Sequence, residues 1–178
     1  MKRILKWSER EFGFNQRFFA TLLAGGIFLF LIPTLLIRVL PETDELLGFP
    51  SFSFGIVNLV LGGILVLIGG FYALWSIISQ LTRARGTPLP MMATQKLLID
   101  GPFKQSRNPM GFGTVSLYLG ISVVVGSLSS IIVVSIFLLL LILWIKKVEE
   151  RELEIRFGKD YVAYKNSTPF MARNPWKK

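Results

Sequence analysis

The hydrophobic positions of this chain gather in three long stretches that contain no charged side chain. These uncharged stretches cover residues 18–37, 46–82 and 108–145, and they are 20, 37 and 38 residues long. A helix needs ~20 apolar residues to cross the hydrocarbon core of a bilayer, because it rises only ~1.5 Å per residue. The first stretch therefore predicts one membrane-spanning helix, and the other two are long enough for more.

Polar and glycine-containing breaks divide these stretches further. A short loop with two prolines at residues 41–50 follows the first span, and the run 126–130 (Gly-Ser-Leu-Ser-Ser) predicts a tight helical hairpin. We predict spans at about residues 18–38, 54–79, 110–125 and 130–145, an inner loop at 80–109 and a tail at 146–178. The pattern thus predicts an all-α fold, a multi-pass membrane helical bundle with four transmembrane helices in a single domain over residues 1–178.

Small and polar residues inside the spans predict how the helices contact one another. Gly62–Gly63 and Gly69–Gly70 lie seven residues apart, near one face of the second span. Small residues let helix backbones approach closely in membranes, so these pairs predict tight helix packing. Asn58 on the same span predicts a hydrogen bond to a neighbouring helix, and Pro33 predicts a bend in the first span.

Both ends of the chain carry amphipathic sequence. Residues 1–17 mix charged and aromatic side chains, which suits a short interfacial helix. Beyond Ile145 we expect the last span to continue out of the membrane as a charged helix. In that helix Lys146–Glu150 and Glu152–Arg156 have the spacing of i,i+4 ion pairs, and Gly158 is a natural stop.

The distribution of basic residues predicts an orientation. The chain carries 20 Lys and Arg against 11 Asp and Glu, a net charge of +9. All basic residues except Arg38 lie before the first span, in the inner loop or after the last span. Cytoplasmic segments of membrane proteins are enriched in Lys and Arg, so we expect both termini in the cytoplasm. The membrane is then a bacterial inner membrane or one of the endoplasmic reticulum type, with anionic lipid favouring the basic segments.

Composition narrows the classes of function. With 52% hydrophobic and 17% charged residues in this layout, a water-soluble enzyme, a disordered chain and a nucleic-acid-binding module are excluded. The chain contains no Cys and no His, so it lacks thiolate nucleophiles, the usual zinc or iron ligands and a histidine base. Any chemistry must rely on carboxylates, Arg, Lys, Tyr, amides, backbone groups or a cofactor, and we predict no metal site.

Two polar features carry candidate chemistry. The inner-loop run 97–113 joins a Gly-Pro turn to Arg107 at the membrane edge and then to a Gly-x-Gly that ends at Gly113. Glycines expose backbone N–H groups and let a flat ligand approach closely. The second feature is the pair Glu149-Glu150 after the last span. The predicted hairpin brings both features to a similar depth, where carboxylates can bind an ammonium or ribose hydroxyls.

Each of these residues also has a purely structural interpretation. Arg107 suits an interfacial anchor whose charge reaches the headgroups, and Pro109 suits the first position of a helix. Glu149-Glu150 suits a solvated helix face. The occurrence of all of them in order, at one membrane edge, favours a shared function.

At these residues the sequence resembles the membrane methyltransferases that include isoprenylcysteine carboxyl methyltransferase and the phospholipid N-methyltransferases. Their shared pattern is a Gly-x-Tyr turn, then Arg-His-Pro-x-Tyr-x-Gly, an apolar stretch and a Glu-Glu pair. Here it occurs as Gly-Pro-Phe at 101–103, Arg-Asn-Pro-Met-Gly-Phe-Gly at 107–113, and Glu149-Glu150. Gly86-Thr87-Pro88 and the run 157–164 are further family features. The resemblance covers about half of the chain.

The resemblance implies S-adenosylmethionine as the cofactor, membrane lipids as partners and methyl transfer to a lipid-like acceptor. It implies a cofactor site built from the cytoplasmic loop and the ends of the last two spans, in a fold that also has a C-terminal helix. The cofactor-binding positions it implies are Gln95, Leu97, Leu98, Gly101, Phe103, Arg107, Asn108, Pro109, Met110, Gly111, Gly113, Glu149 and Glu150. The implied catalytic residues are Glu150, which could deprotonate an amine acceptor, and Arg107.

Three departures from the family pattern bear on the acceptor. Asn108 replaces the usual His, Gly111 replaces the usual Tyr, and Ile145 stands where the prenylcysteine enzymes carry an Arg that is thought to meet the substrate carboxylate. The last departure favours a phospholipid amine. A prenylcysteine-type carboxyl O-methyltransferase stays open, because Lys146 or Arg151 could bind the carboxylate. A non-catalytic membrane scaffold that retains the fold also stays open.

Overall fold

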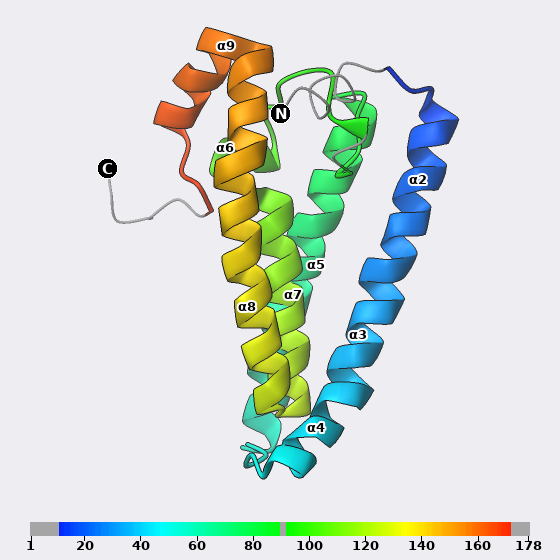
Figure 1. The fold of residues 1–178 in the computed structure, drawn as a ribbon, viewed down its shortest axis with the longest axis vertical. Coiled ribbons are helices and arrows are strands. Elements are labelled where there is room, and N and C mark those ends of the chain that lie inside the picture. The colour runs from blue at the N-terminus through cyan, green and yellow to red at the C-terminus, as the bar shows by residue number, and fades with distance from the viewer. Residues whose placement is uncertain (1–10, 90–91, 172–178) are drawn as a thin grey trace.

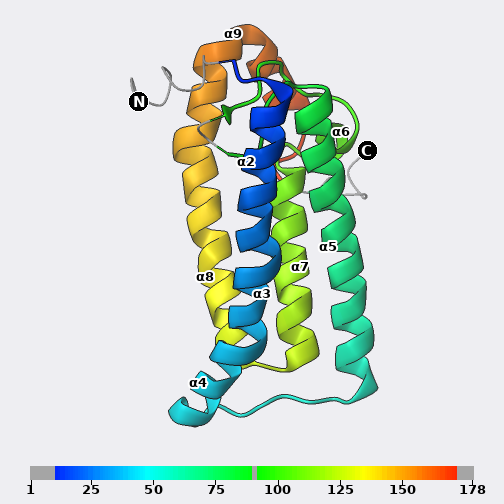
Figure 2. The same cartoon turned by 90° about the vertical axis from the view of Figure 1, so that its right-hand side faces the viewer.

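The structure is a computed structural model that describes residues 11–89 and 92–171, and within these ranges the regular elements are all helical. They are α2 (Phe14–Gly26), the π-helical η1 (Ile27–Leu31), α3 (Ile32–Thr34), the π-helical η2 (Leu35–Val39), α4 (Leu40–Leu47), α5 (Ile56–Thr82), α6 (Pro102–Gln105), α7 (Pro109–Val125), α8 (Leu128–Trp144), the π-helical η4 (Ile145–Glu149) and α9 (Glu150–Ser167). The long helices run side by side (Figures 1 and 2). We call the end of the bundle that carries α6, α9 and the start of α2 the loop end.

Within the described residues, three continuous helical stretches are long and apolar enough to cross a membrane: Phe14–Leu47, Ile56–Thr82 and Leu128–Ser167. α7 is also apolar, but its 17 residues extend only ~26 Å at ~1.5 Å per residue, which is short of a hydrocarbon core of ~30 Å. Leu23, Leu67 and other large apolar side chains are exposed on the outside of the bundle, as lipid-facing side chains are. The predicted all-α membrane bundle is confirmed, and the count of four spans stays a prediction.

Glycines that repeat every seven residues let α5 and α7 pack backbone to backbone. A Cβ atom added to Gly62 would lie 2.6 Å from the carbonyl oxygen of Gly120, and one added to Gly69 would lie 2.6 Å from that of Gly113. The predicted packing role of Gly62 and Gly69 is therefore confirmed. Gly63 has open space around it instead. The contact fixes the position of α7 and of the residues at its start.

A tight hairpin joins α7 to α8, as predicted. Gly126 has φ +74°, a left-handed conformation that favours glycine. At the start of α8, the carboxylate of Asp44 accepts a hydrogen bond from the Ser129 N–H at 2.8 Å, which suits the positive end of a helix dipole. The Asn58 amide donates to the Val123 carbonyl at 2.9 Å, so the predicted interhelical hydrogen bond is confirmed.

The loop predicted at residues 41–50 is shorter than expected. The first helix continues through Pro41 as α4 and ends at Leu47, before Gly48 with φ +67°. Proline normally breaks a helix because its ring meets the carbonyl four residues earlier. Here the π-helical turns η1 and η2 contain the carbonyls that lie four residues before Pro33 and Pro41. Because π-helical turns are wider, they leave room for the proline rings. The interfacial helix predicted for residues 1–17 lies largely outside the described residues.

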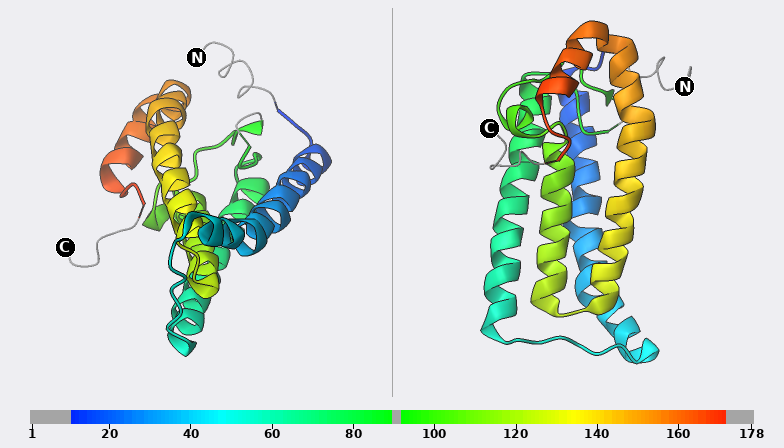
Figure 3. Two further views of the ribbon diagram at one scale, coloured as in Figure 1. Left: turned by 60° about the horizontal axis from the view of Figure 1, so that its bottom comes forward. Right: turned by 90° about the vertical axis from the view of Figure 1, so that its left-hand side faces the viewer.

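The last helix leaves the bundle and folds back on itself. Gly158 has φ +53° and ψ −126°, and the second half of α9 returns toward the bundle beside α6 (Figure 3). The predicted pair Glu152–Arg156 is confirmed at 2.7 Å. The predicted pair Lys146–Glu150 is wrong, because the Glu150 oxygens bind Arg107 and Lys165 instead and the π-helical η4 changes the register of this turn.

Candidate functional site

A cavity of about 340 Å³ lies at the loop end, between α7, α8, α9 and the inner loop. Phe28, Phe137 and Leu141 line its apolar part, and they belong to the apolar helices of the bundle. Arg107 and Glu149 are among the charged side chains that line its other part. One space therefore joins the apolar interior of the bundle to charged groups at its end.

Most of the positions that the sequence singled out come together here. Those that line the cavity are Leu97, Leu98, Phe103, Arg107, Asn108, Pro109, Met110, Gly111, Glu149 and Glu150. The local reason is the start of α7, where Asn108 is the N-cap and Pro109 occupies the first helical position. The hairpin at Gly126 then returns the chain to the same end of the bundle, so segments about 40 residues apart share one wall.

Three predicted positions do not line the cavity. The Gln95 N–H donates to the Ala84 carbonyl at 2.7 Å within the inner loop. Gly101 has φ +60° and begins α6, so its conformational freedom shapes the chain rather than a ligand surface. Gly113 faces α5, where an added Cβ would lie 2.5 Å from the Ala73 backbone nitrogen. The second glycine of the Gly-x-Gly therefore serves helix packing.

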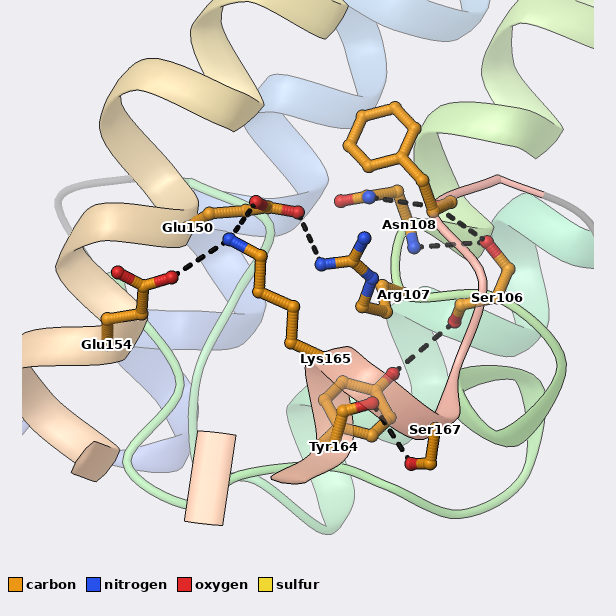
Figure 4. Close-up of polar contacts among 9 residues, drawn as sticks. Ser106, Arg107, Asn108, Glu150, Glu154, Tyr164, Lys165 and Ser167 are labelled. Carbon is orange, nitrogen blue, oxygen red and sulfur yellow. Dashed lines mark hydrogen bonds and ion pairs between the residues drawn. The ribbon is translucent and has the colours of Figure 1, made fainter. Parts of the chain in front are cut away.

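A chain of ion pairs starts at Arg107 and Glu150, which line the cavity, and continues to Lys165 and Glu154, which do not line it (Figure 4). Arg107 Nη1 lies 2.6 Å from Glu150 Oε1, and Lys165 Nζ lies 2.7 Å from Glu150 Oε2. The same Lys165 nitrogen lies 2.8 Å from Glu154 Oε1. Glu150 is 6% exposed, so it is buried and each of its oxygens has a cationic partner. The structural interpretation of Glu149-Glu150 as a solvated helix face therefore does not hold for Glu150.

The C-terminal segment 168–170 crosses the inner loop beside Arg107. The Pro169 carbonyl accepts from the Arg107 N–H at 2.9 Å. The Phe170 carbonyl accepts from the Asn108 amide at 3.0 Å and from the Ser106 hydroxyl at 3.3 Å. Asn108, which departs from the motif, thus uses its amide to hold the C-terminal segment. The Arg107 guanidinium also lies 5.7 Å from the centre of the Phe170 ring.

Comparison with protein families connects this arrangement to a known group. The profile of the phospholipid methyltransferase family matches residues 57–160, which is more than half of the chain. The match runs from α5 through the inner loop into α9, and it includes the cavity residues Arg107, Glu149 and Glu150. The chain belongs to the phospholipid methyltransferase family. Comparison with curated proteins and with solved structures gives no significant match.

In this member of the phospholipid methyltransferase family, the surroundings of the Glu149 carboxylate differ from those of the Glu150 carboxylate. Glu149 lines the cavity, and among the described residues no basic side chain lies within 4.0 Å of its carboxylate. Removal from bulk water raises the pKa of Glu149 to about 7, with further contributions from the negative charges of Glu152 and Glu150. Glu149 is nevertheless an exposed residue, so its carboxylate is accessible to a ligand. Glu149 is therefore a carboxylate that ionises near neutral pH and is open to a ligand.

Two polar atoms at the cavity are buried without a hydrogen-bond partner among the described residues. They are the Arg107 Nε, a donor, and the Gln80 Oε1, an acceptor. Buried polar atoms are normally paired, so both are available to a ligand. Among the residues that the structure describes, no group of three or more Asp or Glu is arranged to hold a metal ion.

The sequence interpretation missed the contribution of the tail beyond Gly158. Tyr161 and Tyr164 line the cavity and are buried. The Tyr164 hydroxyl donates to the Phe103 carbonyl at 2.6 Å, which ties the tail to the inner loop. The sequence marks the run 157–164, which contains both tyrosines, only as a feature of the resemblance. What it could not reveal was the reversal at Gly158 that directs them back to the bundle.

Proposed function

We propose that this protein transfers a methyl group from S-adenosylmethionine to the amine of a membrane phospholipid, inside the cavity at the loop end. The observation that carries the proposal is the continuity of the cavity. Its apolar part, with Phe28 and Phe137, suits lipid, and its charged part, with Arg107 and Glu149, suits a polar cofactor and a headgroup. The family match supports methyl transfer to a lipid-type acceptor.

The residues present fit S-adenosylmethionine. A volume of about 340 Å³ falls in the range of small-molecule pockets, about 300–1,000 Å³. Leu97, Leu98 and Phe103 would provide apolar walls for a base. The unpaired Nε–H of Arg107 would donate to an anionic group of the cofactor. The bound cofactor supplies a methyl group that is already activated, so the protein's tasks are alignment and exclusion of water.

The two adjacent glutamates would then have separate roles. Glu150 would hold Arg107 in place, since both of its oxygens are engaged by Arg107 and Lys165. Glu149 would face the ammonium of the acceptor and accept its proton, because a base with a pKa near the working pH is the most effective. This assignment moves the proton-accepting role from Glu150, where sequence reasoning put it, to Glu149.

The lining supports an amine over a carboxylate as the acceptor. Ile145 is buried and apolar at the cavity, and Arg107 is already paired with Glu150. A substrate carboxylate would meet Glu149 without a free cation, which is unfavourable in a partly desolvated site. We place the cofactor, and with it both chain termini, on the cytoplasmic side.

The test supplies labelled S-adenosylmethionine to the full chain in lipid nanodiscs. One arm contains phosphatidylethanolamine, and the other contains a farnesylcysteine analogue in phosphatidylcholine. We expect label in the ethanolamine lipid and none in the analogue. Label in the analogue alone would support carboxyl O-methylation instead. Cofactor binding by calorimetry without transfer to either acceptor would overturn the amine assignment, and absence of binding would favour the scaffold interpretation.

A further inference from the structure

A second hollow lies on the outer side of the junction between η4 and α9. This basic groove has a volume of about 460 Å³ and is lined by Lys146, Lys147, Glu150, Arg151, Glu154 and Lys165. Glu150 also lines the cavity, so its side chain separates the two spaces. Figure 4 shows it between Arg107 on one side and Lys165 on the other.

The acidic side chains of the basic groove are already neutralised. Glu150 and Glu154 both bind the ammonium of Lys165, at 2.7 and 2.8 Å. Glu150 has Arg107 as a second cation at 2.6 Å. The groove therefore offers no free carboxylate to a cationic ligand.

In the described part of the chain, the other cations of the groove have no acidic partner. Lys147 and Arg151 are exposed, and among the described residues no carboxylate lies within 4.0 Å of either. The Lys146 ammonium lies 5.2 Å from the centre of the Phe170 ring, a cation–π contact that holds it at the edge of the groove without reducing its charge. The groove consequently favours an anion.

The depth of these cations matches the headgroup layer. Lys146 directly follows the apolar stretch that ends at Ile145, and Arg151 lies ~7.5 Å beyond Lys146 along the helix at ~1.5 Å per residue. The headgroup region adds roughly 5–8 Å to each side of the hydrocarbon core. On the preceding turns Leu140 and Leu143 are 61% and 50% exposed. An apolar surface that suits acyl chains is therefore followed along the helix by a cationic surface at the depth of the lipid phosphates.

We propose that the basic groove binds the phosphate of an anionic phospholipid, whose acyl chains lie along Leu140 and Leu143. A zwitterionic lipid brings an ammonium for which the groove has no free acid, so a headgroup with net negative charge is preferred. The cavity favours a cationic headgroup instead, because Glu149 provides it with a free carboxylate. The proposal does not depend on the proposed function, because the groove lies outside the cavity.

Native mass spectrometry of the full chain in detergent tests the proposal, with phosphatidylglycerol and phosphatidylcholine of equal acyl chains. We expect one phosphatidylglycerol to bind more tightly than phosphatidylcholine. Each basic residue near the membrane surface contributes ~1 kcal/mol, about fivefold in affinity. The double variant Lys147→Gln/Arg151→Gln should therefore weaken phosphatidylglycerol binding about 25-fold and leave phosphatidylcholine binding unchanged.

Two matched variants separate the groove from general surface charge. Lys104→Gln/Lys159→Gln removes the same charge from exposed positions outside the groove and should retain binding. Lys147→Arg/Arg151→Lys keeps the charge and should also retain it. Equal weakening by the two charge-removing variants would overturn the proposal. Full displacement of the lipid by an equal concentration of inorganic phosphate would overturn it too, because the site would then be one for free phosphate.

Discussion

Glu149 and Glu150 are neighbours in the chain and differ in what surrounds their charge. Arg107 and Lys165 compensate Glu150 directly, at 2.6 and 2.7 Å. Among the described residues, no basic side chain lies within 4.0 Å of the Glu149 carboxylate, and the nearby Glu152 raises the pKa of Glu149 further. One carboxylate thus belongs to the framework of the site, and the other is free to interact with a ligand. The two residues should respond differently to the same substitution.

Glu149→Gln should remove the pH dependence of methyl transfer between pH 6 and 8. With the pKa of Glu149 raised to about 7, its ionised fraction rises from ~0.1 at pH 6 to ~0.9 at pH 8. The wild-type rate should therefore increase nearly tenfold over this range if Glu149 accepts the proton. Loss of a general base typically costs ~10²-fold or more, so the variant should be slow at both values. Initial rates with saturating cofactor measure this.

Thermal unfolding of the same variant distinguishes a lost base from a damaged fold. The pKa of Glu149 is raised in the folded state, so its favourable contribution to stability is complete below about pH 4.5 and is lost as pH rises through about 7. At pH 8 the folded protein carries an unfavourable charge that Glu149→Gln removes. The melting temperature at pH 8 should stay equal or rise. A lower melting temperature together with a pH-dependent rate would contradict the assigned role.

Glu150→Gln should destabilise the protein. The substitution leaves Arg107, whose side chain is 12% exposed, without its charged partner, and breaking a buried ion pair on one side costs about 3–5 kcal/mol. Glu154→Gln is the matched control, because Glu154 and Lys165 are about a third exposed and such pairs contribute ~0–1 kcal/mol. Melting temperatures in detergent make the comparison. Equal losses for the two variants would show that Glu150 has no special structural role.

Among the elements, α5 and α7 depend on each other through their glycines. α7 is short and apolar on all sides, so it has no polar face that could fix its position. Instead, the backbones of α5 and α7 meet at Gly62, Gly69, Gly113 and Gly120. Dispersion contacts between closely spaced backbones provide such packing in membranes. Since Arg107 to Gly111 immediately precede or begin α7, the glycine contact also determines where this part of the site lies.

Gly69→Ala should therefore destabilise the bundle, whereas Gly63→Ala should not. The added Cβ at Gly69 would lie 2.4 Å from the Leu117 backbone nitrogen, while at Gly63 it meets nothing within 4 Å. Overpacking typically costs about 1–3 kcal/mol, and Ala is the better helix former by up to ~1 kcal/mol. Melting temperatures of the two variants give the answer. Equal changes in the melting temperatures of the two variants would show that close backbone packing at Gly69 does not fix the position of α7.

The elements that the sequence predicted well are those with a strong local signal. Apolar length defined the helices, and Gly126 with its serines defined the hairpin. The continuation into α4 escaped prediction because Pro41 normally ends a helix, and only the π-helical η2 accommodates it. The reversal at Gly158 was not predicted either, because a glycine that ends a helix does not indicate the direction of the chain after it. Tyr164 and Phe170 join the site through that reversal.

For the molecule as a whole, the site residues that could be predicted were those in a short ordered motif. The run 107–111 and Glu149-Glu150 meet because one hairpin connects them, which the sequence makes visible. Lys165 reaches Glu150 only through tertiary structure, and the pairing of Glu150 made Glu149 the open carboxylate. Which of two identical neighbouring side chains is buried depends on helix phase at η4, and a π-helical turn leaves no clear mark in the residue pattern.

The arrangement of the whole molecule also bears on its orientation in the membrane. The start of α2, the inner loop and α9 lie at one end of the bundle (Figure 2), and this end carries Arg83, Arg85, Lys96, Lys104 and Arg107 among other basic residues. The opposite end carries Arg38 together with Glu42, Asp44 and Glu45. Lys and Arg are retained on the cytoplasmic side, while acidic residues contribute little to orientation.

We therefore expect both termini in the cytoplasm and residues 48–55 on the other side. Reporter fusions at the N-terminus, at Ser51 and at the C-terminus measure this, with one reporter active only in the cytoplasm and one active only outside it. The Ser51 fusion is the internal control, since it must differ from the other two. An outside signal at either terminus would contradict the orientation. Because α2 and α9 share one end of the bundle, opposite signals at the two termini would contradict the helical arrangement itself.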